Sequence, residues 1–236
     1  KPLTMKVRVI YMSMLMLLFS IAGCTGIEDD DGLDEINTDK LKILALHGGG
    51  DTPEGLQGQL GMQDLISDLP EFEFFFADAP DDESLCNQCW YADPPDGKGE
   101  PTTDRDWADI SILYLDEIVA ENGPFHGILG YSQGCPMATV YIANSNTTFE
   151  RAFLFNGYLP TTHSGLNDTI NEVAPINTKA LIFGGDNDVF IFGVDELAGV
   201  YLDPTILISS TADHHLPDKD DETYQDVLSF FREGLN

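Results

Sequence analysis

A serine flanked by glycines, Ser132 in the Gly-Tyr-Ser-Gln-Gly stretch of residues 130–134, has the setting of a reactive nucleophile. It follows an apolar run and precedes a segment with helical spacing, the strand–turn–helix context that a nucleophilic serine on a sharp turn requires. The glycines suit such a turn, because side chains there would collide with neighbouring backbone. A serine hydroxyl is a weak nucleophile, so this chemistry also needs a general base within hydrogen-bond reach.

Candidates for that base, and for an acid to orient it, come later in the chain. Asp186 and Asp188 follow one apolar run, and His214 and His215 follow the next. If both runs are strands of a parallel sheet, these side chains and Ser132 lie on the same edge of it. The order serine, acid, histidine fits a hydrolytic triad, in which the acid orients the histidine and stabilises its protonated form.

A glycine-rich loop supplies a further part of this chemistry. Residues 46–50, Leu-His-Gly-Gly-Gly, follow the first apolar run of the domain. Backbone N–H groups in such a loop can approach the oxyanion of a tetrahedral intermediate, and the N–H of Gln133, the residue after the serine, is the second expected donor. We expect His47 to shape this loop and not to act as a base.

The elements that must position these residues alternate between strand-like and helix-like patterns. This alternation predicts an α/β fold with a mainly parallel central sheet and helices on both faces. Apolar runs predict strands within residues 41–46, 72–80, 125–130, 151–157, 179–185 and 205–210. Helical spacing predicts helices over residues 55–69, 104–121, 133–143, 194–201 and 221–234, with a long loop at 81–103.

The strongly negative net charge of the chain argues against some classes of binding partner. The chain carries 41 Asp and Glu against 11 Lys and Arg, for a formal net charge of -30. Such a surface repels nucleic-acid phosphates and anionic headgroups, so we expect a small-molecule substrate and no nucleic-acid partner. Two interpretations of the acidity stay open, namely adaptation to high salt and an ordinary acidic extracellular protein.

The N-terminal residues 1–24 have the pattern of a signal peptide. A basic start precedes an apolar run of residues 9–22, and the segment ends in Ile-Ala-Gly-Cys, which resembles a bacterial lipobox with Cys24 as the lipidated residue. The alternative is an ordinary signal peptide cut near residue 23. Residues 25–39 are acidic and predict a disordered linker, which leaves residues 40–236 as the folded domain. We therefore expect an exported protein, anchored in the cell envelope through Cys24 or else secreted.

Three further cysteines lie in the domain. Cys86 and Cys89 are spaced for a local disulfide, which an exported protein can keep, although the spacing alone leaves this open. A redox motif and a zinc site are less favoured, because neither a thioredoxin-like context nor a second ligand pair accompanies them. Cys135, just past the serine turn, is expected to be a small buried residue.

Taken together, these motifs resemble the FSH-type serine hydrolases, which are α/β-hydrolases related to the carboxylesterase and acyl-protein thioesterase group. The resemblance is carried by the segments Lys42–Pro80, Gly127–Ala138, Arg151–Pro160, Lys179–Phe190 and Ala212–Pro217. It covers nearly the whole domain and implies hydrolysis of carboxylic esters or thioesters without a cofactor.

Residue by residue, the resemblance implies that Ser132 is the nucleophile, Asp188 the acid and His214 the base, with Asp186 and His215 as second choices. It also implies that the backbone N–H groups of Gly49 and Gln133 bind the oxyanion. The chain departs from the family pattern just before the histidine, where Ala-Asp replaces the usual glycines.

The resulting functional prediction is a serine hydrolase that cleaves short- to medium-chain carboxylic esters through an acyl-enzyme. No large lid insertion is evident, so residues 81–103 are expected to border a fairly open pocket and to set specificity. Two alternatives remain: a thioesterase that uses the same triad, and a non-catalytic binding protein of hydrolase fold held at the cell surface.

Overall fold

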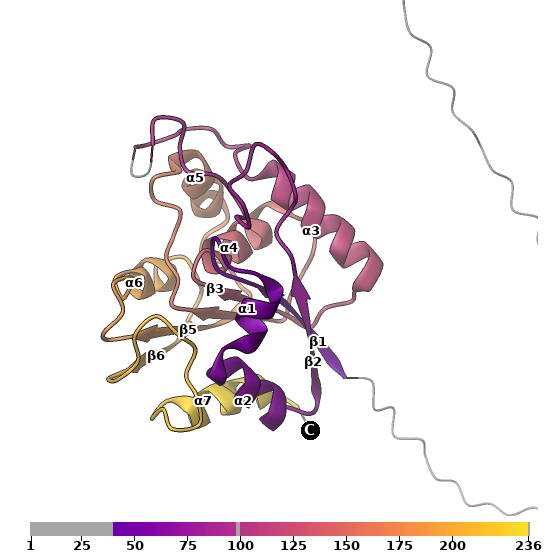
Figure 1. The fold of residues 1–236 in the computed structure, drawn as a ribbon, viewed down its shortest axis with the longest axis vertical. Coiled ribbons are helices and arrows are strands. Elements are labelled where there is room, and N and C mark those ends of the chain that lie inside the picture. Colours follow the sequence, from indigo (N-terminus) through magenta and orange to yellow (C-terminus); the bar gives the residue numbers. More distant parts are fainter. Residues whose placement is uncertain (1–39, 98–99, 236) are drawn as a thin grey trace, which may run out of the picture. The chain divides into compact units, whose positions relative to one another are not determined.

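This computed structural model describes residues 40–97 and 100–235 (Figure 1). The predicted signal peptide, its lipobox-like end at Cys24 and the acidic linker lie outside these residues and stay predictions. Every helix within the described ranges is too short or too polar to cross a membrane.

The described strands form one parallel sheet, in the order β2-β1-β3-β4-β5-β6. They are β1 (Leu41–Leu46), β2 (Phe72–Ala77), β3 (Gly127–Tyr131), β4 (Arg151–Phe155), β5 (Lys179–Gly185) and β6 (Thr205–Ser209). The chain passes from β1 outward to β2 and then returns to the other side of β1. The strand order thus reverses between β1 and β3, and in open α/β sheets ligands bind beyond the carboxyl ends of the strands at such a point.

Helices cover both faces of this sheet (Figure 1). They are α1 (Pro53–Gly58), α2 (Leu60–Asp68), α3 (Asp109–Asn122), α4 (Gly134–Asn144), α5 (Ser164–Val173), α6 (Gly193–Ala198) and α7 (Tyr224–Arg232). Apolar side chains of α3, α4, α5 and α6 share one buried cluster, and those of α1, α2 and α7 share the other. The predicted α/β-hydrolase architecture is therefore confirmed.

Successive side chains along a strand point to opposite faces of the sheet and so belong to the two clusters in turn. In β1, Leu44 and Leu46 belong to the cluster under α3 and α4, whereas Ile43 and Ala45 belong to the cluster under α1, α2 and α7. A strand buried on both faces is a continuous apolar run, which is why the strand prediction for this segment has the correct bounds.

The predicted helix over residues 55–69 is two helices. The chain breaks at Gln59, where φ of -63° and ψ of 139° are extended. A Cβ at Gly61 in the first turn of α2 would lie 2.5 Å from the carbonyl oxygen of Pro217, which explains the glycine. The break brings the start of α2 against the loop that also carries His214.

Two other helices differ from the prediction. Residues 105–108 are turns, so α3 begins at Asp109 and the Trp107 indole N–H donates to the Ala92 carbonyl instead of lying on a helix face. Helix α5 was not predicted, since its Ser, Asn and Asp residues favour turns and caps over helix interiors. Its buried Leu166 and Ile170, four residues apart, were the available signal.

Packing of α7 on the sheet yields a stability prediction. The Phe231 ring is fully buried and stacks on Phe153 of β4, with centroids 3.8 Å apart and planes 10° apart. We expect Phe231→Ala to lower the free energy of unfolding by about 3–5 kcal/mol, because it removes buried apolar area and leaves a cavity. The same substitution at Phe192, which is 53% exposed, is the control and should change it by less than about 1 kcal/mol. Denaturant unfolding of both variants measures this, and equal losses would contradict the packing.

Candidate active site

Ser132 occupies the turn between β3 and α4. Its φ is 53°, in the left-handed region that non-glycine residues seldom adopt. Two hydrogen bonds hold this conformation: the Ser132 N–H donates to the Phe155 carbonyl at 3.0 Å, and its own carbonyl accepts from the Cys135 N–H at 3.0 Å. The turn therefore fixes a half-buried serine at the carboxyl end of β3.

The flanking glycines are required by close backbone approach. A Cβ at Gly130 would lie 2.5 Å from the carbonyl oxygen of Gly134, and a Cβ at Gly134 would lie 2.3 Å from that of Leu46. Both distances are far below van der Waals contact. The expectation that side chains would collide at these two positions is confirmed.

A chain of hydrogen bonds links Ser132 to His214 and Asp188. The distance from Ser132 Oγ to His214 Nε2 is 3.0 Å, and that from His214 Nδ1 to Asp188 Oδ2 is 2.8 Å. A carboxylate can only accept, so His214 Nδ1–H donates to Asp188, and Nε2 of the neutral ring accepts from the serine hydroxyl. Asp188 is buried, and its Oδ1 also accepts the Phe190 N–H at 2.9 Å.

The two alternatives from the sequence lie elsewhere. Asp186 is exposed at the start of the turn after β5. The His215 ring is 3.0 Å from the Leu216 carbonyl through Nδ1 and 3.4 Å from Asp213 through Nε2. Of the candidates, the structure therefore brings Asp188 and His214 to Ser132, and Asp213 lies beside His215.

Two strand-end residues that sequence reasoning missed hold the loop of His214. The Tyr131 hydroxyl donates to the His214 carbonyl at 2.7 Å, and burial raises the pKa of Tyr131 to about 12, so the phenol keeps its proton. The Asn156 amide donates to the His215 carbonyl at 2.7 Å and accepts the Gly185 N–H at 3.1 Å. Asn156 itself has a φ of 52°. The Asn-Gly pair after β4 was the sequence signal for such a turn residue.

The glycine loop after β1 lies beside the serine. A Cβ at Gly48 would come within 3.2 Å of Ser132 Cβ, and one at Gly49 would lie 2.9 Å from Gln133 Oε1. Gly49, Gln133 and Ser132 line the same pocket. His47 is buried, with Nδ1 2.7 Å from the Gly48 carbonyl and Nε2 accepting the Ala79 N–H, so it shapes this loop as expected.

Residues 88–91 of the long loop bind both the glycine loop and Gln133. The Gly50 N–H donates to the Gln88 carbonyl at 2.7 Å. The Gln133 side-chain amide accepts the Trp90 N–H and donates to the Tyr91 carbonyl, each at 3.1 Å. The buried Trp90 indole N–H adds a bond to the His47 carbonyl at 2.9 Å. We name this set of contacts, made by residues 88–91, the loop clamp.

Cys86 and Cys89 form a disulfide at the start of the segment that makes the loop clamp. The local disulfide that their spacing allowed is therefore present. Cys135 is fully buried as expected, and burial raises the pKa of its thiol well above the ordinary value. The Cys135 Sγ lies 3.1 Å from the Gly130 carbonyl oxygen and 3.3 Å from that of Phe155, and its one proton can be donated to either, so its contacts are those of a packing residue beneath the serine turn.

A pocket of about 530 Å³ opens above Ser132. Its walls come from the disulfide and the loop after it, from the segment after β4 and from the segment after β5. The lining includes Tyr91, Asp93, Tyr158, His163, Phe190 and Phe192. As predicted, residues 81–103 border the pocket.

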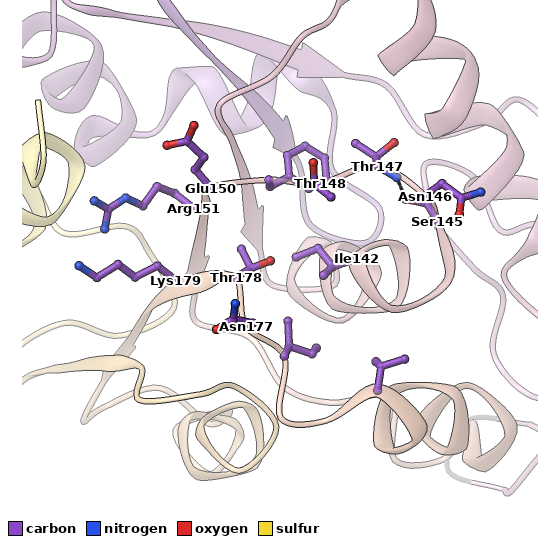
Figure 2. A pocket seen from close by; sticks show the side chains of 13 residues that line it. Ile142, Ser145, Asn146, Thr147, Thr148, Glu150, Arg151, Asn177, Thr178 and Lys179 are labelled. Atoms are coloured by element: carbon purple, nitrogen blue, oxygen red, sulfur yellow. Dashed lines mark hydrogen bonds between the residues drawn. The ribbon is translucent and has the colours of Figure 1, made fainter.

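A larger hollow of about 690 Å³ lies at the opposite edge of the sheet, where β4 and β5 begin (Figure 2). Figure 2 shows Arg151 and Lys179 extending in the same direction from these strand starts. Both side chains are engaged by Glu233. This hollow contains neither the serine nor its partners, so we place the site in the smaller pocket.

A parallel sheet that gathers a serine, a histidine and a buried carboxylate on one edge is the arrangement of the α/β-hydrolases, and the chain is a serine hydrolase of this fold. The family model described as "Serine hydrolase (FSH1)" matches residues 37–226. The chain belongs to this family.

Relatives and solved structures agree with this assignment. Esterase C25G4.2 of Caenorhabditis elegans is 22% identical over 213 residues, which cover 84% of this chain and 95% of the relative. Esterase FUS5 of Gibberella moniliformis is 25% identical over 206 residues, covering 80% and 85%. Among solved structures, esterase PE8 has a TM-score of 0.60 at 19% identity, covering 82% of this chain and 92% of that one. Arabidopsis thaliana SOBER1 has a TM-score of 0.58 at 20% identity, covering 82% and 98%.

The loop clamp generates a prediction at Gln133. Gln133→Met keeps the side-chain length but leaves the Trp90 N–H and the Tyr91 carbonyl without their partner, at a cost of about 1–3 kcal/mol each. We expect lower stability and, because the glycine loop loses its support, at least about tenfold lower kcat. Denaturant unfolding and ester turnover measure the two effects. Gln63→Met, at an exposed position on α2, is the control, and a Gln133 variant indistinguishable from it would refute the clamp.

Proposed function

We propose that the protein cleaves carboxylic esters with short to medium acyl chains through an acyl-enzyme on Ser132. The observation that carries the proposal is the continuous chain from Ser132 Oγ through His214 to the buried Asp188. The family assignment and the relatives named as esterases support the same reaction class.

In this mechanism, Ser132 Oγ attacks the ester carbonyl carbon while His214 Nε2 takes the hydroxyl proton. Asp188 stabilises the imidazolium, and its burial strengthens that interaction. His214 then gives the proton to the departing alkoxide. Water then attacks the acyl carbon while His214 takes one of its protons; the bond from that carbon to Ser132 Oγ breaks, His214 returns the proton to Oγ, and the carboxylic acid leaves.

The oxyanion of each tetrahedral intermediate is assigned to the backbone N–H groups of Gly49 and Gln133. Both residues line the pocket beside Ser132. The loop clamp fixes the glycine loop and the Gln133 side chain together, which preorganises the two donors before substrate binds.

The pocket supports the restriction to short and medium acyl chains. Its volume of about 530 Å³ lies within the range of small-ligand sites, and its walls are loops of the domain itself. A thioester could enter the same pocket and react by the same steps. Turnover of an ester and a thioester with identical acyl groups separates the two preferences.

The nucleophile assignment is tested at Ser132. We expect a fluorophosphonate probe to form one adduct, at Ser132, and Ser132→Ala to lower kcat about 10⁶-fold for 4-nitrophenyl esters. Across a series of acyl chains, wild-type kcat/KM should be highest for short and medium chains. Ser229→Ala, at an exposed serine of α7, is the control and should react like the wild type. Activity that survives Ser132→Ala would disprove the mechanism.

The choice of acid is tested by two identical substitutions on one turn. Asp188→Asn keeps the shape of the side chain but removes the charge that orients and stabilises the His214 imidazolium, so kcat should fall about 10⁴-fold. Asp186→Asn should stay within about threefold of wild type, because its side chain is exposed. Steady-state kinetics compares them, and the reverse ranking would assign the role to Asp186.

A further inference from the structure

In the part of the chain that the structure describes, the pocket lining contains an acidic side chain but no Lys or Arg to balance it. Among the residues that line the pocket, Asp93 is the carboxylate, and the lining includes neither Lys nor Arg. His163 is buried, which lowers its pKa, and its Nε2 lies 2.9 Å from the Ala92 carbonyl. Burial raises the pKa of Tyr91 and of Tyr158, so both stay uncharged phenols. At neutral pH the pocket therefore carries a single negative charge.

Aromatic rings also line this pocket. Tyr158 and Phe190 stack with centroids 5.1 Å apart, and Phe192 follows at 6.2 Å from Phe190. Tyr91 packs edge-on against His163, with ring centroids 4.9 Å apart. Phe192 is 53% exposed, so part of this aromatic surface faces the opening. Ring faces attract cations through their quadrupole, most strongly where water is excluded.

Asp93 lines the same pocket as these rings. Asp93 follows Tyr91 by two residues on the same loop, and its charge adds, after burial, to the raised pKa of both Tyr91 and Tyr158. Within the described residues, no basic side chain pairs with Asp93. An exposed carboxylate beside several rings has the composition of an ammonium-binding site.

The charge of the whole chain acts in the same direction. A net charge of -30 attracts cationic ligands toward the surface and repels anionic ones. This long-range attraction is screened within about 10 Å at 0.1 M salt, so it adds to the contacts in the pocket but does not replace them.

We propose that the pocket beside Ser132 selects esters that carry a cationic ammonium group, which is bound between Asp93 and the rings of Tyr91, Tyr158 and Phe192. The inference rests on the proposed ester hydrolysis at Ser132 and names its substrate class. Esters that bear a carboxylate are disfavoured by the same charge.

The test compares substrates that differ in one atom. Acetylcholine is paired with 3,3-dimethylbutyl acetate, and 4-nitrophenyl 4-(trimethylammonio)butanoate is paired with 4-nitrophenyl 5,5-dimethylhexanoate, so a quaternary nitrogen replaces a carbon in either the alcohol or the acyl half. We expect kcat/KM to favour the cation by about tenfold in at least one pair at low salt. A ratio near one in both pairs would overturn the proposal.

Variants separate the pocket from the bulk charge. Asp93→Asn should lower the cation preference, which is the ratio of kcat/KM values within a substrate pair, about fivefold. Asp96→Asn removes the same charge from the same loop at an exposed position outside the pocket, and should leave the preference within about twofold of wild type. Phe192→Leu keeps apolar area but removes a ring, and should lower the preference about threefold. Equal effects of Asp93→Asn and Asp96→Asn would show attraction by net charge alone and refute the site.

Binding without turnover distinguishes failure of this inference from failure of the proposed reaction. Ligand-observed NMR compares choline with its neutral analogue 3,3-dimethylbutan-1-ol on the Ser132→Ala protein. Tighter binding of choline, lost in Ser132→Ala/Asp93→Asn, supports the ammonium site even if no ester is turned over. Hydrolysis of neutral esters by the wild type, with equal binding of the two alcohols, would keep the proposed function and reject the ammonium site.

Discussion

The site depends on one close approach of backbone, where the first residue of α4 lies against the end of β1. A Cβ at Gly134 would come within 2.3 Å of the Leu46 carbonyl oxygen, so only glycine lets the helix begin there. This contact, at the point where the strand order reverses, sets the serine turn beside the glycine loop. Ser132 is held at a φ of 53° by the hydrogen bonds that its backbone N–H and carbonyl make with Phe155 and Cys135.

The histidine is less well supported by regular structure, because His214 lies in a loop after β6. Hydrogen bonds from neighbouring strand ends compensate for this. Tyr131 and Asn156 donate to carbonyls of the His214 loop, and Asp188 accepts from the imidazole ring itself. Side chains at the ends of β3 and β4 and in the turn after β5 thus hold the His214 segment at several points, and a general base requires such a fixed geometry.

The long loop after β2 contacts both the pocket and the segment that carries Ser132. Its residues 88–91 bind the glycine loop and the Gln133 side chain, while Asp93, two residues on, belongs to the pocket wall. The Cys86–Cys89 disulfide closes the start of the same segment. A change in this loop therefore acts on the pocket lining and on the contacts of the glycine loop and Gln133 together.

The sequence by itself determined the strand runs, the serine turn and the order of the three site residues, because these follow from apolar periodicity and from glycine spacing between near neighbours in the chain. It did not determine the break at Gln59. Nor did it determine helix α5, because the weak helix formers of α5 are stabilised by tertiary packing. Neither could it decide between Asp186 and Asp188, or between His214 and His215. Neighbouring residues on a turn point in different directions, and only the folded turns bring one of each pair within 3.0 Å of its partner, across 82 residues in the case of Ser132 and His214.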